Sequence, residues 1–236
     1  MKKILAFTLA ETLIVMGVIG IVSALTLPNL NSSTGEKEKI VKVKKIYQNL
    51  TDAFGRAQAV YGPIDEWKTL DANVGAQITR FGERISEFMK VSKTCGIQTN
   101  MGCFSNKNLK YVDGTSIGSS YEQNTSYKFV LADGTAIIIM PLGIISVDID
   151  GPIKGQNQVG TDIFTFLYDE KGNVSPYGPG SGGFSEYLQG SFSIMKNGYM
   201  ASSWIINYDN MDYLKLTSAG KCPNGTTPTE QNPRCK

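Results

Sequence analysis

Apolar residues dominate the start of the chain, where one acidic side chain, Glu11, interrupts the run from Phe7 to Leu27. A helix that crosses a bilayer needs about 20 apolar residues, so this run predicts a transmembrane helix. A carboxylate near the centre of a bilayer costs about 2.5–3.5 kcal/mol on insertion scales, which makes Glu11 a candidate functional residue. Pro28 follows the run and predicts a kink or a break in the helix, because proline has no N–H.

A second apolar pattern follows, in which apolar side chains recur at spacings of three and four. These side chains are Ile40, Val43, Tyr47, Leu50, Phe54, Ala57 and Tyr61. The spacing predicts an amphipathic helix over residues 28–61. It continues from Phe7 as one long helix, or a second helix begins near Glu36.

Five lysines cluster near the start of the amphipathic pattern. They are Lys37, Lys39, Lys42, Lys44 and Lys45. Cations are unfavourable at a helix N-terminus, so the cluster favours one long helix over a new helix that begins here. Two roles for these lysines remain open. They form a solvated face, or they face acidic lipid or a neighbouring molecule.

The rest of the chain changes from helical to strand-like spacing. The apolar positions of the next helix are Val74, Ile78, Phe81, Ile85 and Phe88. They predict a helix over residues 71–91, which Gly75 and Gly82 weaken. After a loop over 95–125, apolar segments separated by turns such as Asp133-Gly134, the last of them alternating over 162–168, predict an antiparallel meander of about four strands. The amphipathic helix is expected to pack on this meander, which is an α+β fold.

Composition narrows the classes of function. The chain has 236 residues, a net charge of +2 and no histidine. This length suits one domain, or one domain with an appendage, and the small net charge gives no sign of a nucleic-acid partner. Without histidine there is no Ser-His-Asp triad and no H-E-x-x-H zinc site. We therefore expect a protein that is not an enzyme.

The four cysteines are even in number and follow a membrane-targeting N-terminus, which predicts two disulfides in an oxidising compartment. Three pairings are possible, and the local ones, Cys95 with Cys103 and Cys222 with Cys235, are the simplest. A zinc site with four cysteines is the alternative. The C-x2-C spacing typical of such sites is missing.

Two ordinary interpretations of the N-terminus leave Glu11 unexplained. A signal peptide cut after Ala24 would release a secreted, soluble binding protein, but an acid has no purpose inside such a peptide. A plain membrane anchor, carrying for instance a periplasmic enzyme, is the second interpretation. Because lysines lie on both sides of the run, the positive-inside rule gives it no clear orientation.

The stretch AFTLAETLIVMGVIGIVSALTLP resembles the N-terminus of type IV pilin-like proteins, a family that includes the type II secretion pseudopilins. The resemblance rests on the F-T-L-x-E core close to the start of the chain and on Pro28, which matches a proline of the family. It implies that a prepilin peptidase cuts between Ala6 and Phe7 and that the new amine of Phe7 is N-methylated. Ala6 departs from the family, which prefers glycine there.

The resemblance also implies an organisation of the chain. It has a leader at 1–6, a transmembrane and assembly helix at 7–27, an amphipathic continuation at 28–61 and a globular pilin-like domain at 62–221. The last segment is a tail at 222–236, in which the two cysteines are expected to form a disulfide. The protein is expected to cross the bacterial inner membrane once, with its globular part outside the cytoplasm, and then to enter a type IV pilus or a type II secretion pseudopilus.

The expected partners are copies of this chain, minor pilins, a prepilin peptidase/methyltransferase and an inner-membrane assembly platform. In this family, apolar helices pack together in the filament core. There the Glu11 carboxylate pairs with the Phe7 amine of a neighbouring subunit and sets the register between subunits, since breaking a buried ion pair is costly. The alternative is that Glu11 simply reaches the lipid headgroups.

One cluster of oxygen-bearing side chains lies in the β-rich part, at Asp148, Asp150, Asn157 and Asp162. Such hard ligands suit Ca²⁺, although their spacing is not that of an EF-hand. Major pseudopilins hold calcium in a loop between late strands, so the resemblance supports a possible Ca²⁺ site. The alternative is that the first two aspartates end a strand and begin a turn.

Overall fold

The computed structural model describes residues 9–67, 73–105, 109–118, 121, 123–181, 183–190 and 193–235, without the side chains of 23–34. The chain divides into two compact units, Met1–Glu38 and Lys39–Lys236. The first unit contains the beginning of the N-terminal helix. The second contains the rest of that helix and the whole sheet.

Helix α1 (Leu9–Tyr61) is continuous, so the alternative of a second helix that begins near Glu36 is wrong. The helix runs through Pro28, so the break that was one of the two expectations there is wrong, whereas the kink stays a prediction. The transmembrane span expected at 7–27 finds no support, since among the described residues no helix is long and apolar enough to cross a membrane.

The second unit is built on one antiparallel sheet of six strands in the order β1-β2-β3-β4-β5-β6. The central strands β2 (Tyr127–Leu131), β3 (Ala136–Met140), β4 (Ile144–Asp148) and β5 (Ile163–Tyr168) confirm the expected meander. The two edge strands, β1 (Val91–Gly96) and β6 (Val174–Pro176), were not expected. β1 has no clean alternation of apolar residues and β6 is very short, so neither gives the usual strand signal.

Shorter helices surround the sheet. They are η1 (Ile64–Trp67), α2 (Val74–Ser86), η2 (Pro141–Gly143), α3 (Ser185–Leu188), α4 (Ala201–Tyr208) and η3 (Asp212–Lys215). Helix α2 begins at an N-cap, Asn73, whose side-chain oxygen accepts a hydrogen bond of 2.8 Å from the Ala76 N–H. An asparagine in this position satisfies one of the N–H groups that a helix start leaves unpaired.

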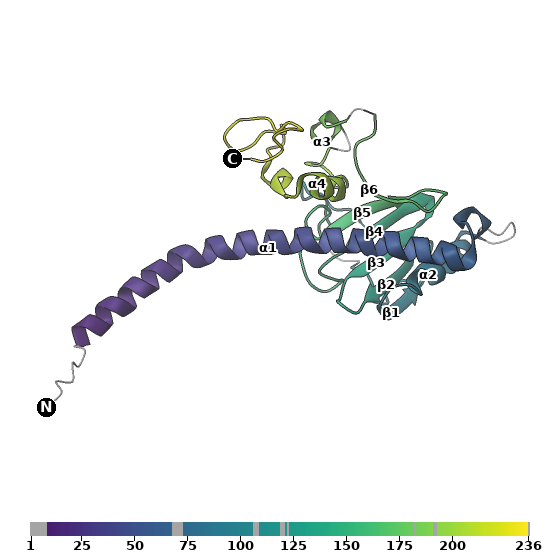
Figure 1. Cartoon of the computed structure of the whole chain (residues 1–236), viewed down its shortest axis with the longest axis horizontal. Coiled ribbons are helices and arrows are strands. Elements are labelled where there is room, and N and C mark those ends of the chain that lie inside the picture. Colours follow the sequence, from purple (N-terminus) through teal and green to yellow (C-terminus); the bar gives the residue numbers. More distant parts are fainter. Residues whose placement is uncertain are drawn as a thin grey trace. The chain divides into compact units, whose positions relative to one another are not determined.

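The part of α1 that begins at Lys39 lies across one face of the sheet (Figure 1). Tyr47 stacks on Phe166 of β5 with the ring centroids 5.9 Å apart, and Phe54 lies 5.3 Å from the ring of Tyr168. Val43, Leu50 and Phe54 are completely buried in this core. Their spacing along the chain is the apolar pattern of the sequence, so the expected helix packed on an antiparallel sheet is confirmed.

Both disulfides join neighbours in the sequence. Cys95 is bonded to Cys103 and Cys222 to Cys235, with Cα–Cα distances of 6.1 and 5.3 Å. The local pairing is therefore confirmed. Because all four sulfurs are consumed by these bonds, the alternative of a zinc site with four cysteines is wrong.

Candidate functional site

The described beginning of α1 exposes apolar side chains over its whole circumference. Nine large ones between Leu9 and Val22 are each at least 53% exposed. The residues are Leu9, Leu13, Ile14, Val15, Met16, Val18, Ile19, Ile21 and Val22. An exposed apolar surface of this extent marks a site where a protein meets another protein or a lipid phase. We call this stretch, Leu9–Val22, the apolar helix segment.

Glu11 lies in the first turn of α1 and is itself exposed. An acid in the first turn of a helix is favourable, because the N–H groups there carry partial positive charge. The same place puts the carboxylate at the edge of the apolar helix segment. The expected cleavage and methylation sites, Ala6 and Phe7, lie outside the described residues.

The lysine cluster of the sequence connects α1 to three loops of the second unit, because two of its lysines reach the same loop after β4. The Lys39 ammonium donates to the Thr161 carbonyl at 2.9 Å, and Lys42, Lys44 and Lys45 form ion pairs with Asp150, Asp209 and Asp133 at 3.3, 2.7 and 3.2 Å. Pairs as exposed as these contribute about 0.2–1 kcal/mol each. These four lysines therefore do not form a purely solvated face, because each contacts the body of its own chain.

The loop after β4 carries the predicted oxygen cluster, and Asp162 holds it together. Its carboxylate accepts hydrogen bonds from the backbone N–H groups of Asn157 at 2.8 Å and Gln158 at 2.6 Å, and also from that of Gln156. Burial raises the pKa of Asp162, while these three hydrogen bonds and the nearby Lys39 charge act in the opposite direction. The Asp162 carboxylate thus fixes the backbone of residues 156–158 by hydrogen bonds.

Asp148 ends β4 and is completely buried. Its Oδ1 accepts from the N–H groups of Asp150 at 3.1 Å and Gly151 at 2.9 Å, which is the turn that the sequence alternative predicted. Its Oδ2 is buried and accepts no hydrogen bond from the described residues. Burial, followed by the charge of Asp162, raises the pKa of Asp148 to about 8.

The four predicted calcium ligands are brought to one loop but are not all available to an ion. Asp150 is paired with Lys42, and Asp162 already accepts three N–H groups. Asp148 Oδ2 and the side-chain oxygen of Asn157 are buried without a partner among the described residues. Within that part of the chain, no group of three or more Cys, Asp or Glu side chains is arranged to hold a metal ion. The cluster therefore fits a cation only through Asp148 and Asn157.

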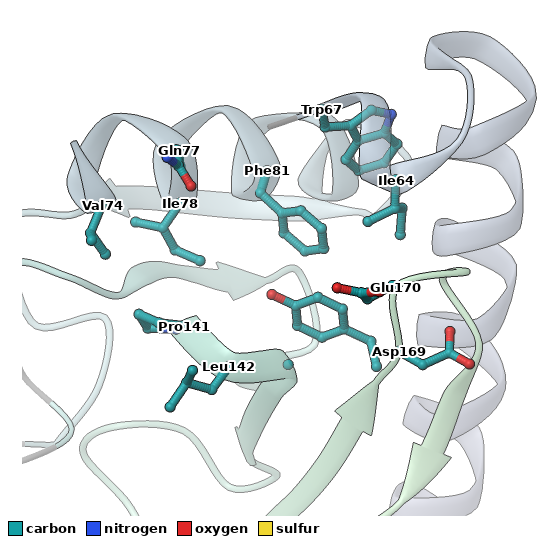
Figure 2. A pocket seen from close by; sticks show the side chains of 12 residues that line it. Ile64, Trp67, Val74, Gln77, Ile78, Phe81, Pro141, Leu142, Asp169 and Glu170 are labelled. Carbon is teal, nitrogen blue, oxygen red and sulfur yellow. The ribbon is translucent and has the colours of Figure 1, made fainter. Parts of the chain in front are cut away.

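The second unit also has an apolar pocket of about 580 Å³ that no residue pattern predicted (Figure 2). Helices η1 and α2 form one wall with Trp67, Ile78 and Phe81, and the η2 turn lies opposite with Pro141 and Leu142. These residues come from three separate segments. Apolar spacing predicts each helix or strand but does not predict which of them enclose a space.

Comparison with protein-family models, with curated proteins and with solved structures finds no match for this chain.

Proposed function

We propose that this protein is a pilin-like structural subunit that a prepilin peptidase processes and that assembles into a type IV pilus or a type II secretion pseudopilus. The observation that supports the proposal most is the apolar helix segment, Leu9–Val22, which is exposed all round and carries Glu11 in its first turn. The second unit has its own core and its own disulfides, as a domain displayed on a filament would need.

In the proposed mechanism, the apolar helix segments of neighbouring subunits bury one another. Each large apolar side chain that becomes fully buried contributes about 1.5–3 kcal/mol, so the contacts of one helix are enough to drive association. This burial is not directional and would allow many axial offsets. The Glu11 carboxylate, paired with the Phe7 amine of the next subunit, would select one offset, since an unpaired buried charge costs about 3–5 kcal/mol.

The proposal also gives a location and a set of partners. Before assembly the precursor would be held in the bacterial inner membrane by residues 7–27, with the globular part outside the cytoplasm. The partners would be further copies of the chain, minor pilins, the peptidase/methyltransferase and the inner-membrane assembly platform. Disulfides at Cys95–Cys103 and Cys222–Cys235 are typical of a domain outside the cytoplasm.

Intact mass and N-terminal sequencing of the protein from its native host test the proposal directly. We expect a chain that begins at N-methylated Phe7. A chain that begins at Leu25 would show that a signal peptide had been removed after Ala24, and the protein would then be a secreted, soluble binding protein. A chain that still begins at Met1 would leave a simple anchor and would also contradict the proposal.

Substitution of Glu11 tests the assembly mechanism. Glu11→Ala is expected to leave the membrane-bound amount of the protein unchanged and to reduce sheared filaments at least tenfold, because the Phe7 amine of the neighbour would lose its partner. Asp52→Ala is the matched control, since Asp52 is an exposed acid on the same helix whose described partner is Arg56. Equal filament yields from the two variants would contradict the register mechanism.

We also propose that the loop after β4 binds Ca²⁺, because Asp148 Oδ2 and the Asn157 side-chain oxygen are buried without partners among the described residues. Asp148 and Asn157 would hold the ion, and Asp150 and Asp162 would add negative charge. When bound, the ion would neutralise the Asp148 carboxylate. Thermal unfolding with Ca²⁺ and with a chelator tests this, and a ligand at 100 times its Kd stabilises by about 2.7 kcal/mol. An unchanged Tm would contradict a site.

A further inference from the structure

The apolar pocket has a volume and a lining that are typical of small-molecule sites. Its volume of about 580 Å³ lies within the range of about 300–1,000 Å³ found for ligand sites. Figure 2 shows Ile78 and Phe81 directed from α2 into the space, with Leu142 on the opposite side. Such a lining favours a ligand with an apolar body, because binding removes the surface of that body from water.

One wall of the pocket is fixed by contacts between aromatic rings. The Phe81 ring stacks on that of Tyr168 with the centroids 4.6 Å apart, and it lies 5.3 Å from the Trp67 ring. The indole N–H of Trp67 donates a hydrogen bond of 3.0 Å to the Gly62 carbonyl. These contacts exist without a ligand, so little of the binding free energy is lost in ordering this wall.

The opposite wall is held by a close backbone contact. A Cβ on Gly143 would lie 2.4 Å from the Tyr168 carbonyl oxygen, so only glycine allows the η2 turn to approach β5 this closely. The preceding residue, Leu142, has a φ of +66° and is 95% exposed. That backbone conformation is uncommon for a leucine, and residues strained in this way cluster at functional sites such as ligand-binding loops.

The Tyr168 hydroxyl is a polar group of the pocket that lacks a partner. Tyr168 lines the pocket, and its ring is held between Phe81 and Phe54, whose centroids lie 4.6 and 5.3 Å away. Its hydroxyl makes no hydrogen bond to a described residue. Burial raises the pKa of Tyr168 to about 12, so the group stays a neutral phenol that can donate. A tyrosine hydroxyl in an apolar environment usually has a hydrogen-bond partner, and a ligand in this pocket would supply one.

The charges around the pocket favour a neutral ligand. Among the described residues that line it are two acids, Asp169 and Glu170, and no base, so an anion would meet like charges. The Asp169 carboxylate is already used by its own turn, where it accepts three hydrogen bonds. A cation would meet the Arg84 guanidinium, which lies over the Trp67 ring, 5.1 Å from its centroid.

We propose that this pocket binds a small neutral molecule, an aromatic or alicyclic body that carries one carbonyl oxygen. The body would lie between the wall formed by Ile78 and Phe81 and the η2 turn at Leu142. The carbonyl oxygen would accept a hydrogen bond from the Tyr168 hydroxyl. Burial of the body supplies most of the affinity, and the single hydrogen bond fixes the orientation of the ligand and selects for the carbonyl.

Four probes that share a naphthalene body and differ in one head group test the proposal on the detergent-solubilised full chain. They are 2-acetylnaphthalene, 2-isopropenylnaphthalene, 2-naphthoate and 2-naphthamidine, whose head groups are a ketone, an alkene of the same shape, an anion and a cation. The indole N–H signal of Trp67 in two-dimensional NMR reports binding. Trp204 is the internal control, because the chain has two tryptophans and Trp204 is completely buried in the core, bonded to Asn210.

The ketone is expected to bind most tightly of the four probes. One hydrogen bond to the Tyr168 hydroxyl should give it about fivefold higher affinity than the alkene, which cannot accept one. Both charged probes should bind more weakly than either neutral probe, because an apolar pocket does not replace the water around a charged head group.

Two variants that each remove one hydroxyl locate the site. Tyr168→Phe keeps the ring stacked on Phe81, so it is expected to lower the affinity for the ketone about fivefold, to that for the alkene, and to leave the latter unchanged. Tyr208→Phe is the matched control, because Tyr208 is exposed and does not line the pocket. It should change neither affinity. All variants are measured in the same detergent, so partitioning of the probes into micelles affects them equally.

Three results would overturn the proposal. The first is that no probe shifts the Trp67 signal, or that a charged probe binds most tightly. The second is that the ketone binds no more tightly than the alkene, or that Tyr168→Phe leaves its affinity unchanged. The third is a Trp67 signal that shifts with protein concentration when no probe is present, which would show that a second copy of the chain occupies the pocket.

Discussion

Gly82 in the middle of α2 gives a prediction whose sign depends on the tertiary structure. Glycine costs about 1 kcal/mol relative to alanine inside a helix, so propensity alone predicts that Gly82→Ala stabilises the protein. In the structure, a Cβ on Gly82 would lie 2.1 Å from Cγ and 2.7 Å from Cβ of Tyr127. Carbon atoms in contact lie about 3.5–4.0 Å apart, so Tyr127 or the helix would have to move by more than 1 Å.

Tyr127 has little freedom to make that movement. It is 3% exposed, it belongs to β2, and its ring lies 6.1 Å from that of Phe129. Inserting a carbon into a well-packed core typically costs about 1–3 kcal/mol, and a contact this short belongs at the upper end. We therefore expect Gly82→Ala to lower the free energy of unfolding by about 2 kcal/mol after the gain in helix propensity is included.

Urea unfolding followed by circular dichroism measures the effect, and Gly75→Ala is the matched control in the same helix. The nearest atoms to a Cβ on Gly75 are at 3.4 Å, which is an ordinary contact, so this variant should be neutral or slightly stabilising. Truncating Tyr127 to alanine should remove the penalty of Gly82→Ala in a double-mutant cycle. If Gly82→Ala stabilises as much as Gly75→Ala, the close packing of α2 on β2 is refuted.

Three further predictions concern the loop after β4, the tail and the base of α1. The pKa of Asp148 is about 8 in the folded protein and ordinarily 3.8, so between these pH values the folded state keeps a proton that the unfolded chain releases. The free energy of unfolding should therefore fall as the pH rises from about 4 to about 8, by at most about 1.4 kcal/mol per pH unit. Asp148→Asn should flatten this profile in urea titrations without added Ca²⁺, and an unchanged slope would contradict the assignment. Replacing Cys222 and Cys235 by serine should cost about 2–4 kcal/mol on thermal unfolding, because it frees a loop with a sequence separation of 13. Lys44→Met should cost less than about 1 kcal/mol, and 1 M salt should remove the difference from the wild type, since its pair with Asp209 is exposed.

The lysine cluster and the oxygen cluster show why a contact pattern does not follow from sequence. The sequence left open whether the lysines form a solvated face or contact acidic lipid or a neighbouring molecule. Their spacing places them on a helix but does not identify what they contact. Their partners lie far along the chain, at sequence separations of 88 for Asp133, 108 for Asp150 and 165 for Asp209. The oxygen cluster was correctly placed at the end of a strand. Which oxygens remain available was decided by backbone N–H groups that no residue pattern reveals.

The sequence by itself determined the features that depend on short-range spacing. Apolar residues spaced three, four and seven apart, such as Val43, Leu50 and Phe54, predicted the buried stripe of α1. Apolar segments bounded by turns predicted β2 to β5, and short separations predicted both disulfides. The tertiary structure alone decided the edge strands, the apolar pocket and the role of Gly82. The physical reason is that periodicity records which face of an element is buried, whereas a pocket or a close approach depends on distances between elements that are far apart in the chain.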